Sequence, residues 1–244
     1  MYNKFAYIYD ELMDDIDYEK WYLYIKSIFD KFQKEPKMLL EMACGTGNLS
    51  YYFAKNGYDL TCFDLSNDML SIAYNKLKNF KKVKILNQNM VNFNINKKFD
   101  AIISICDSIN YILNEEDLLK TFTNVKNHIN KNGIFIFDIN SYYKLSEIIG
   151  DNIFIEDRGD VFYTWENYFD EKNDIVNFFI SFFIQEEDGR YFRFNEEHFE
   201  KAYKTEKIIK LLKQSYFTEI YVFDGFTFNK AHEKSERISF VAIP

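Results

Sequence analysis

Residues 39–48 read LLEMACGTGN, a short apolar strand that ends in a glycine loop, after which a helix starts at once. Glycine lets the backbone approach a ligand closely, and the first turn of a helix offers free N–H groups to negative charge. The stretch therefore predicts a ligand-binding loop at the end of a strand. A dinucleotide-binding fingerprint would have a third glycine or alanine at position 50, where this chain has Ser50.

Strands and helices alternate around this loop, which is typical of an α/β protein whose parallel sheet is covered on both faces. The expected strands are 37–42, 58–63, 83–86, 99–105 and 133–139, and the expected helices between them are 48–55, 66–78 and 114–130. A further helix over 17–34 carries Trp21 on its apolar face. We expect that helix to end before Pro36.

The alternation stops after Gly150, and the sequence then reads mainly as strands. The expected strands are 160–169, 174–186 and 190–203, followed by a helix over 205–214 and two closing strands over 216–223 and 237–243. Turn-forming residues separate the first three strands, which predicts an antiparallel β meander. We therefore expect an α/β domain of residues 1–150 and 205–244, with a subdomain of residues 151–204 inserted into it.

Polar residues follow the next three strands of the predicted sheet. Asp64 ends the second strand, and its carboxylate could accept hydrogen bonds from both hydroxyls of a ribose. Asn89 follows the third strand, where a buried amide could pair with an adenine edge, and residues 104–111 follow the fourth. Ligands bind at the carboxyl ends of strands in open α/β sheets, so we expect one shared site. Taken singly, Asp64 with Ser66 could instead be a helix cap, and the other loops ordinary turns.

With these loops in this order, the chain resembles the class I S-adenosylmethionine-dependent methyltransferases. EMACGTGN, residues 41–48, resembles the family's loop of an acid, three residues, and Gly-x-Gly. FDLSNDML, residues 63–70, resembles its second motif, in which an acid precedes a Ser-capped helix. The resemblance implies a Rossmann-like sheet of seven strands, five of them parallel, closed by an antiparallel hairpin that residues 237–243 would complete.

The resemblance also implies which residues contact the cofactor, S-adenosyl-L-methionine, and its product, S-adenosyl-L-homocysteine. Glu41 would lie near the methionyl ammonium, with Gly45 and Gly47 lining the methionyl moiety. Asp64 would hold the ribose. The other expected cofactor contacts are Ala43, Cys44, Leu65, Met69, Asn89, Met90 and Cys106. Asn89 stands where the family commonly has Asp, and its amide oxygen can still accept a hydrogen bond from the adenine amine.

Within the family, the aromatic opening of the chain and the inserted meander are similar to small-molecule enzymes. Amino-sugar N-methyltransferases and glycine N-methyltransferase-like enzymes are the nearest kinds, and in them an aromatic N-terminal segment folds over the cofactor. Tyr9 and Trp21 are the matching positions, where a hydroxyl or indole N–H could reach the methionyl carboxylate. The alternative is that both residues are simply core aromatics.

Methyl transfer from a sulfonium is a direct in-line displacement in which the protein supplies orientation and electrostatics, so we expect no metal. His128, His198 and His232 are isolated in the sequence, and none lies in a cluster with zinc-ligand spacing. An amine acceptor must lose a proton, and His198 is a weak candidate for the base.

The acceptor is expected on the side of the loop that follows the fourth strand. Asp107, Asn110 and Tyr111 belong to this loop, and we interpret them as groups that position the acceptor. The aromatic-rich residues 151–204 would form the acceptor side, a lid or a contact with a second subunit.

The composition limits the classes of partner that the chain is expected to bind. The chain has 244 residues and a formal charge of −8, which disfavours nucleic acid and leaves a small molecule as the expected acceptor. Three cysteines without CxxC spacing indicate reduced thiols and a cytoplasmic location, and no apolar run is long enough to cross a membrane. We expect a monomer or a homodimer.

Three alternatives remain at this point. An RNA or protein methyltransferase would keep the cofactor and change the acceptor. A nucleotide-dependent oxidoreductase would share the glycine loop and Asp64, although Glu41, Ser50 and the closing hairpin disfavour it. A non-catalytic binding module would keep the site without turnover.

Overall fold

The computed structural model describes residues 4–244, which form two β-sheets of different kinds. The strands of the first sheet are β1 (Met38–Met42), β2 (Asp59–Asp64), β3 (Val83–Asn87), β4 (Phe99–Ser104), β5 (Ile129–Asn140), β10 (Glu219–Asp224) and β11 (Arg237–Ile243). Their order across the sheet is β10-β11-β5-β4-β1-β2-β3. β1 to β5 pair in parallel, and β11 runs antiparallel to both of its neighbours, as the sequence predicts.

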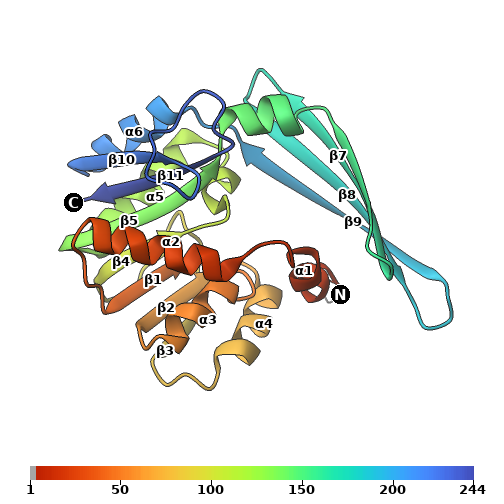
Figure 1. The fold of residues 1–244 in the computed structure, drawn as a ribbon, viewed down its shortest axis with the longest axis horizontal. Helices are drawn as coiled ribbons and strands as arrows, with labels where there is room; N and C mark the ends of the chain where they lie inside the picture. The colour runs from red at the N-terminus through yellow and green to blue at the C-terminus, as the bar shows by residue number, and fades with distance from the viewer. Residues whose placement is uncertain (1–3) are drawn as a thin grey trace.

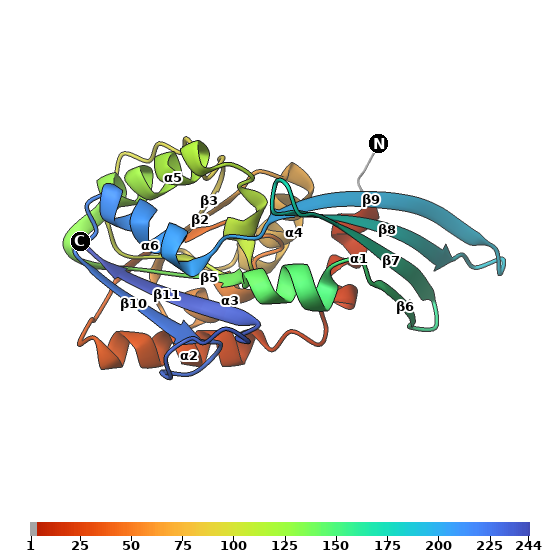
Figure 2. The same ribbon diagram turned by 90° about the horizontal axis from the view of Figure 1, so that it is seen from above.

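Helices cover both faces of this sheet (Figures 1 and 2). α2 (Tyr18–Lys31), α3 (Asn48–Lys55) and α4 (Asn67–Leu77) pack on one face, while α5 (Glu115–His128) and α6 (Thr205–Gln214) pack on the other. Side chains alternate along a strand, so neighbours such as Leu39 and Leu40 on β1 enter opposite hydrophobic clusters. The result is a three-layer α/β/α domain.

The helix starts that the sequence indicates are confirmed where a side chain caps them. Ser66 Oγ accepts a hydrogen bond from Met69 N (3.3 Å) at the start of α4. Asn114 Oδ1 accepts one from Asp117 N (2.9 Å) at the start of α5. These caps fix where the chain leaves the strand ends and turns back, so the polar loops gather at the carboxyl edge of the sheet.

The second sheet is an antiparallel meander that extends away from the first sheet (Figure 1). Its strands are β6 (Ile153–Asp157), β7 (Val161–Asp170), β8 (Ile175–Gln185) and β9 (Tyr191–Lys201). We expected three strands, and the structure adds β6, whose Ile153 and Ile155 are each 63% exposed. Because so much of β6 is at the surface, it lacks the clean alternation that marks a half-buried strand. The whole sheet falls within residues 151–204, and the division into two domains stays a proposal.

Three short segments lie between the two sheets. α1 (Lys4–Leu12) lies under the second sheet in Figure 1, η1 (Ser108–Tyr111) follows β4, and η2 (Lys144–Ile149) follows β5. The buried Asn110 of η1 joins the sheets: its Nδ2 donates to the carbonyl oxygens of Asn140 and Lys201 (3.0 Å each). Its Oδ1 accepts from Asn140 N (3.0 Å). None of the helices built by residues 4–244 has the length and apolar character needed to cross a membrane.

Candidate functional site

The glycine loop after β1 uses left-handed backbone three times. Ala43, Gly45 and Gly47 have φ of 53°, 53° and 79°. A Cβ added at Gly47 would lie 3.1 Å from the Cβ of Ala73 in α4, so glycine is needed there for helix packing. A Cβ added at Gly45 would meet no atom within 4 Å. The space beside Gly45 is therefore open for a ligand.

Glu41 lies at the end of β1, and only 3% of it is exposed. Ser50 Oγ donates a hydrogen bond to Glu41 Oε2 (2.5 Å). Burial raises the pKa of Glu41 to about 8, and the nearby charge of Asp64 acts in the same direction. The carboxyl therefore holds a proton at neutral pH, and a cation bound beside it would favour the ionised form.

Asp64 is fixed at the end of β2. Its Oδ2 accepts from Gly45 N and its Oδ1 accepts from Ser66 N, both at 2.9 Å. Each carboxylate oxygen has a second lone pair, so both can still accept a hydroxyl. Asn87 Nδ2 donates to the carbonyl oxygens of Asp64 (3.1 Å) and Leu65 (2.8 Å). Sequence reasoning assigned no role to Asn87, although it is the last residue of its strand and pairs with Asp64 in register.

The residues expected around an adenine lie at the neighbouring strand ends. Leu65 is 64% exposed, whereas Met69 and Met90 are half-buried. Met90 is held at β4, where Ser104 Oγ lies 3.8 Å from its Sδ. Asn89 is exposed, and its Oδ1 accepts from Val91 N (2.8 Å) in a local turn, so its contact with an adenine stays a prediction.

The loop after β4 is also strained. Cys106 and Asp107, neither of them glycine, have φ of 55° and 54°, a conformation that persists only when its surroundings enforce it. Asp107 N donates to Asp138 Oδ2 (3.2 Å), and Asp107 Oδ1 accepts from Arg237 Nη2 (2.9 Å). Residues in such a conformation cluster at functional sites. Cys106 and Asp107 follow β4, which pairs with β1, the strand that precedes the glycine loop.

Arg237, the first residue of β11, is a site residue that sequence reasoning missed. It forms ion pairs with Asp107 and Asp138, and its guanidinium lies over the ring of Trp21 with its carbon 5.7 Å from the centroid. Burial raises the pKa of Asp138 to about 6 against the opposing charge of Arg237. Trp21 is 4% exposed, so it acts as a core residue behind this cluster.

The N-terminal segment lies close to the loop that follows β4. Burial raises the pKa of Tyr9 well above its ordinary value, and Tyr18, Cys106, Asp107 and Tyr111 add to the shift. Burial also raises the pKa of Tyr18, and the side chains of Asn48 and Tyr9 act in the opposite direction. The structure thus brings Tyr9 near the loop after β4, together with Tyr18, which sequence reasoning had not singled out, and a contact of Tyr9 with the methionyl carboxylate stays a prediction.

Glu200 on β9 is another residue that sequence reasoning missed. It is 2% exposed, its Oε2 accepts from Asn140 Nδ2 (3.0 Å), and burial with the charge of Asp107 raises its pKa well above the usual range. Tyr111 lies near this carboxyl: 48% of the residue is exposed, but burial of its hydroxyl end, with the charges of Glu200 and Asp107, raises its pKa well above the ordinary value. The second sheet therefore contributes an acid to the site.

The expected acceptor-side residues divide into two kinds. His198 lies on the same face of β9 as Glu200, and its ring packs edge-to-face against Tyr111 with centroids 6.1 Å apart. Burial lowers the pKa of His198, so it is neutral at pH 7. Asn110 differs, because its side chain bonds to the backbone of β5 and β9, which makes it a structural joint.

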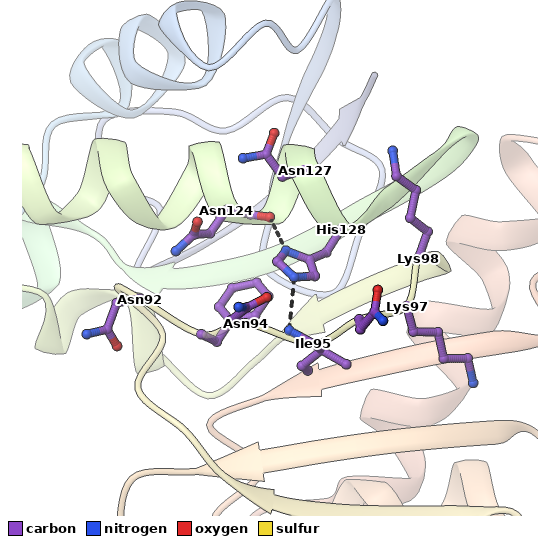
Figure 3. A pocket seen from close by; sticks show the side chains of 10 residues that line it. Asn92, Asn94, Ile95, Lys97, Lys98, Asn124, Asn127 and His128 are labelled. Atoms are coloured by element: carbon purple, nitrogen blue, oxygen red, sulfur yellow. Dashed lines mark hydrogen bonds between the residues drawn. The ribbon is translucent and has the colours of Figure 1, made fainter.

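A separate hollow lies at the opposite, amino edge of the sheet (Figure 3). It is lined by residues 92–98 and by the last turns of α5, where His128 is tied on both sides. His128 Nδ1 lies 2.8 Å from the carbonyl oxygen of Asn124, and its Nε2 accepts from Ile95 N (3.1 Å). This histidine is structural. Across the described residues, no group of three or more His, Cys, Asp and Glu side chains could hold a metal ion.

Comparison with known proteins identifies a family, relatives and solved structures that are similar to this chain. The family described as methyltransferase domain matches residues 39–133. A putative methyltransferase of Geobacillus sp. (strain WCH70) is 32% identical over 243 residues, covering 99% of this chain and 98% of the relative. The crystal structure of an S-adenosylmethionine-dependent methyltransferase from Clostridium acetobutylicum has a TM-score of 0.90 and 43% identity, covering 99% of this chain and 98% of that one. The dTDP-3-amino-3,4,6-trideoxy-alpha-D-glucopyranose N,N-dimethyltransferase of Streptomyces venezuelae is 29% identical over 104 residues, covering 43% of each chain.

Proposed function

This chain belongs to the S-adenosylmethionine-dependent methyltransferases, and we propose that it methylates the nitrogen of a small-molecule amine. Family membership confirms the expected enzyme class and cofactor, and it decides against the oxidoreductase alternative. The acceptor is the new element of the proposal. It rests on the acid that the second sheet contributes to the site, Glu200.

The residues around the glycine loop fit the cofactor. The open space at Gly45 leaves room for its methionyl part, and the carboxyls of Glu41 and Asp64 match its ammonium and its ribose hydroxyls. When bound, S-adenosylmethionine supplies a methyl group on a positively charged sulfur. The chain's own contribution is to orient the acceptor and to handle its proton.

Among the acids of the site, Glu200 is the one best suited to accept a proton from an amine. Asp107 and Asp138 share the cation of Arg237, whereas the hydrogen bond to Glu200 Oε2 comes from the neutral amide of Asn140. Glu200 would take the proton of a bound ammonium, which would free the nitrogen lone pair to accept the methyl group, and the bonding pair would stay with the cofactor's sulfur. Glu200 accepts that proton in its ionised form, and burial, which raises its pKa, makes the ionised carboxylate a stronger base.

The surroundings of Glu200 support a small cationic acceptor. Tyr111 and His198 border it, and a neutral His198 can accept or donate a hydrogen bond without repelling a cation. The formal charge of −8 favours a positively charged acceptor over nucleic acid. The Streptomyces venezuelae relative acts on an amino sugar, which supports nitrogen as the methylated atom.

The test uses the full chain with S-adenosylmethionine that carries a deuterated methyl group. The acceptors are matched pairs that differ in one atom, such as an amino sugar with its hydroxyl analogue and glycine with glycolate. We expect mass spectrometry to find label on amines, with one S-adenosylhomocysteine formed per methyl transferred. Label found only on hydroxyl analogues, or only on added RNA or protein, would contradict the proposal.

A further inference from the structure

Asp10 connects the N-terminal helix α1 to the glycine loop. Its Oδ1 accepts from Thr46 Oγ1 (2.6 Å) and from Asn48 Nδ2 (2.9 Å), and its Oδ2 pairs with Lys76 Nζ (2.5 Å). Lys76 Nζ in α4 also donates to Asn48 Oδ1 (2.5 Å) and Thr46 Oγ1 (3.1 Å). These four residues, which we call the Asp10 latch, bring together three segments that are distant in sequence.

The latch uses the polar side chains of the cofactor loop itself. Thr46 is 1% exposed and stands between the two glycines, while Asn48 is the first residue of α3. Burial opposes ionisation of Asp10, but hydrogen bonds from Lys76, Thr46 and Asn48 hold its pKa below its ordinary value. Asp10 is therefore ionised at neutral pH, and its bonds to the loop are charge-assisted.

The latch also sets the position of Tyr9. A nine-residue helix such as α1 is marginal on its own, so tertiary contacts must hold it in place. Tyr9 precedes Asp10 in the chain and lies close enough to Cys106 and Asp107 for their charges to raise its pKa. Asn48 strengthens the connection, because it bonds to both Asp10 and Lys76 and its side chain also lowers the pKa of Tyr18, as that of Tyr9 does.

We propose that Asp10 is a positioning residue that fastens α1 to the glycine loop and thereby retains the bound cofactor. With the latch closed, Tyr9 stays beside Cys106 and Asp107 and covers the cofactor's methionyl end. With the latch broken, α1 leaves the loop and the cofactor exchanges faster. This role depends on cofactor binding alone and is independent of which acceptor the enzyme uses.

The test compares Asp10→Ala and the milder Asp10→Asn with the control Asp59→Ala. Asp59 pairs with Lys97 at 3.0 Å, with side-chain exposures of 49% and 33%, close to the 37% and 26% of Asp10 and Lys76. We expect S-adenosylhomocysteine to dissociate about tenfold faster from Asp10→Ala, with a smaller change in Asp10→Asn and none in Asp59→Ala. Stopped-flow displacement measures the dissociation rate, and calorimetry gives the dissociation constant.

Two readouts separate positioning from a general loss of structure. At saturating cofactor, kcat should stay within about twofold of wild type while KM for S-adenosylmethionine rises about tenfold. Exchanging the charges, Asp10→Lys with Lys76→Asp, should restore much of the slow dissociation. An unchanged dissociation rate in Asp10→Ala, or an equal rise in Asp59→Ala, would overturn the proposal.

Discussion

The two sheets contribute to the site in different ways. The seven-stranded sheet presents a cofactor loop whose residues are neighbours in the chain, because one strand, one turn and one helix build it. The four-stranded sheet contributes Glu200 and His198, which meet Tyr111, Asn140 and Arg237 only in the folded molecule. A local motif can therefore be recognised in the sequence, whereas a site made by distant strands depends on their register.

The largest expected effect is on the free energy of unfolding and concerns Glu41, the buried acid at the end of β1. Folded Glu41 keeps its proton to about pH 8, while an unfolded chain loses it near pH 4.5. The resulting stability is fully present below pH 4.5 and is lost as the pH rises to about 8, which amounts to roughly 4 kcal/mol. Denaturant titrations of ligand-free protein should show this decline, and Glu41→Gln should flatten it. The exposed Glu35→Gln is the control, and an equal slope in Glu41→Gln and wild type would contradict the assignment.

The joint between the two sheets should give the next largest effect. Asn110→Ala removes three hydrogen bonds to backbone groups, two of them buried and one partly buried, so we expect a loss of about 3 kcal/mol in the free energy of unfolding. Asn114→Ala, which removes a helix cap, should cost only about 1 kcal/mol. Urea denaturation of both variants checks the order, and equal losses would show that Asn110 does not join the sheets.

The two glycines of the cofactor loop should respond differently. Gly47→Ala brings a Cβ to 3.1 Å from Ala73 at a φ of 79°, so we expect it to lower stability by about 1–3 kcal/mol. Gly45→Ala meets no protein atom and pays mainly the backbone strain of about 1–2 kcal/mol. Its larger effect should be on cofactor affinity, measured by calorimetry. If Gly45→Ala binds S-adenosylmethionine as wild type does, the open space is not the cofactor's.

The smallest effect is expected at the outer contact between the N-terminal segment and the second sheet. Arg158 donates to Asp14 Oδ1 (2.6 Å) and Glu156 Oε2 (2.9 Å), and these acids are 70% and 48% exposed. Exposed ion pairs contribute little, so Arg158→Ala should cost less than about 1 kcal/mol and leave cofactor dissociation unchanged. Faster dissociation, at a rate matching Asp10→Ala, would mean that α1 is held from the second sheet as much as from the glycine loop.

Much of the first sheet could be predicted from the sequence because its signals are local. The apolar strands, the caps at Ser66 and Asn114 and the glycine loop each lie within a few residues. The closing strand was predicted within its observed bounds, Arg237–Ile243, for the same reason. The exposure of Asn89 could not be predicted, since an exposed turn and a buried amide site share the same residue types.

The second sheet and its contacts could be predicted only in outline. A meander of aromatic strands was visible, but which strand faces the site depends on pairing between segments far apart in sequence. Glu200 looked like any acid in a polar strand until Asn140 and Asp107 were beside it. Arg237 and the Asp10 latch were invisible for the same reason, because each joins segments that only the fold brings together.

The most direct test of the account measures methyl transfer in a single turnover for Glu200→Gln and Glu197→Gln. Glu197 is an exposed acid on the same strand that accepts a hydrogen bond from Asn177 (2.9 Å), so it is a matched control. We predict that Glu200→Gln slows transfer to the amine about 100-fold and leaves the dissociation constant for S-adenosylmethionine unchanged, while Glu197→Gln alters neither. An undiminished transfer rate in Glu200→Gln would contradict the central claim that the second sheet supplies the proton acceptor.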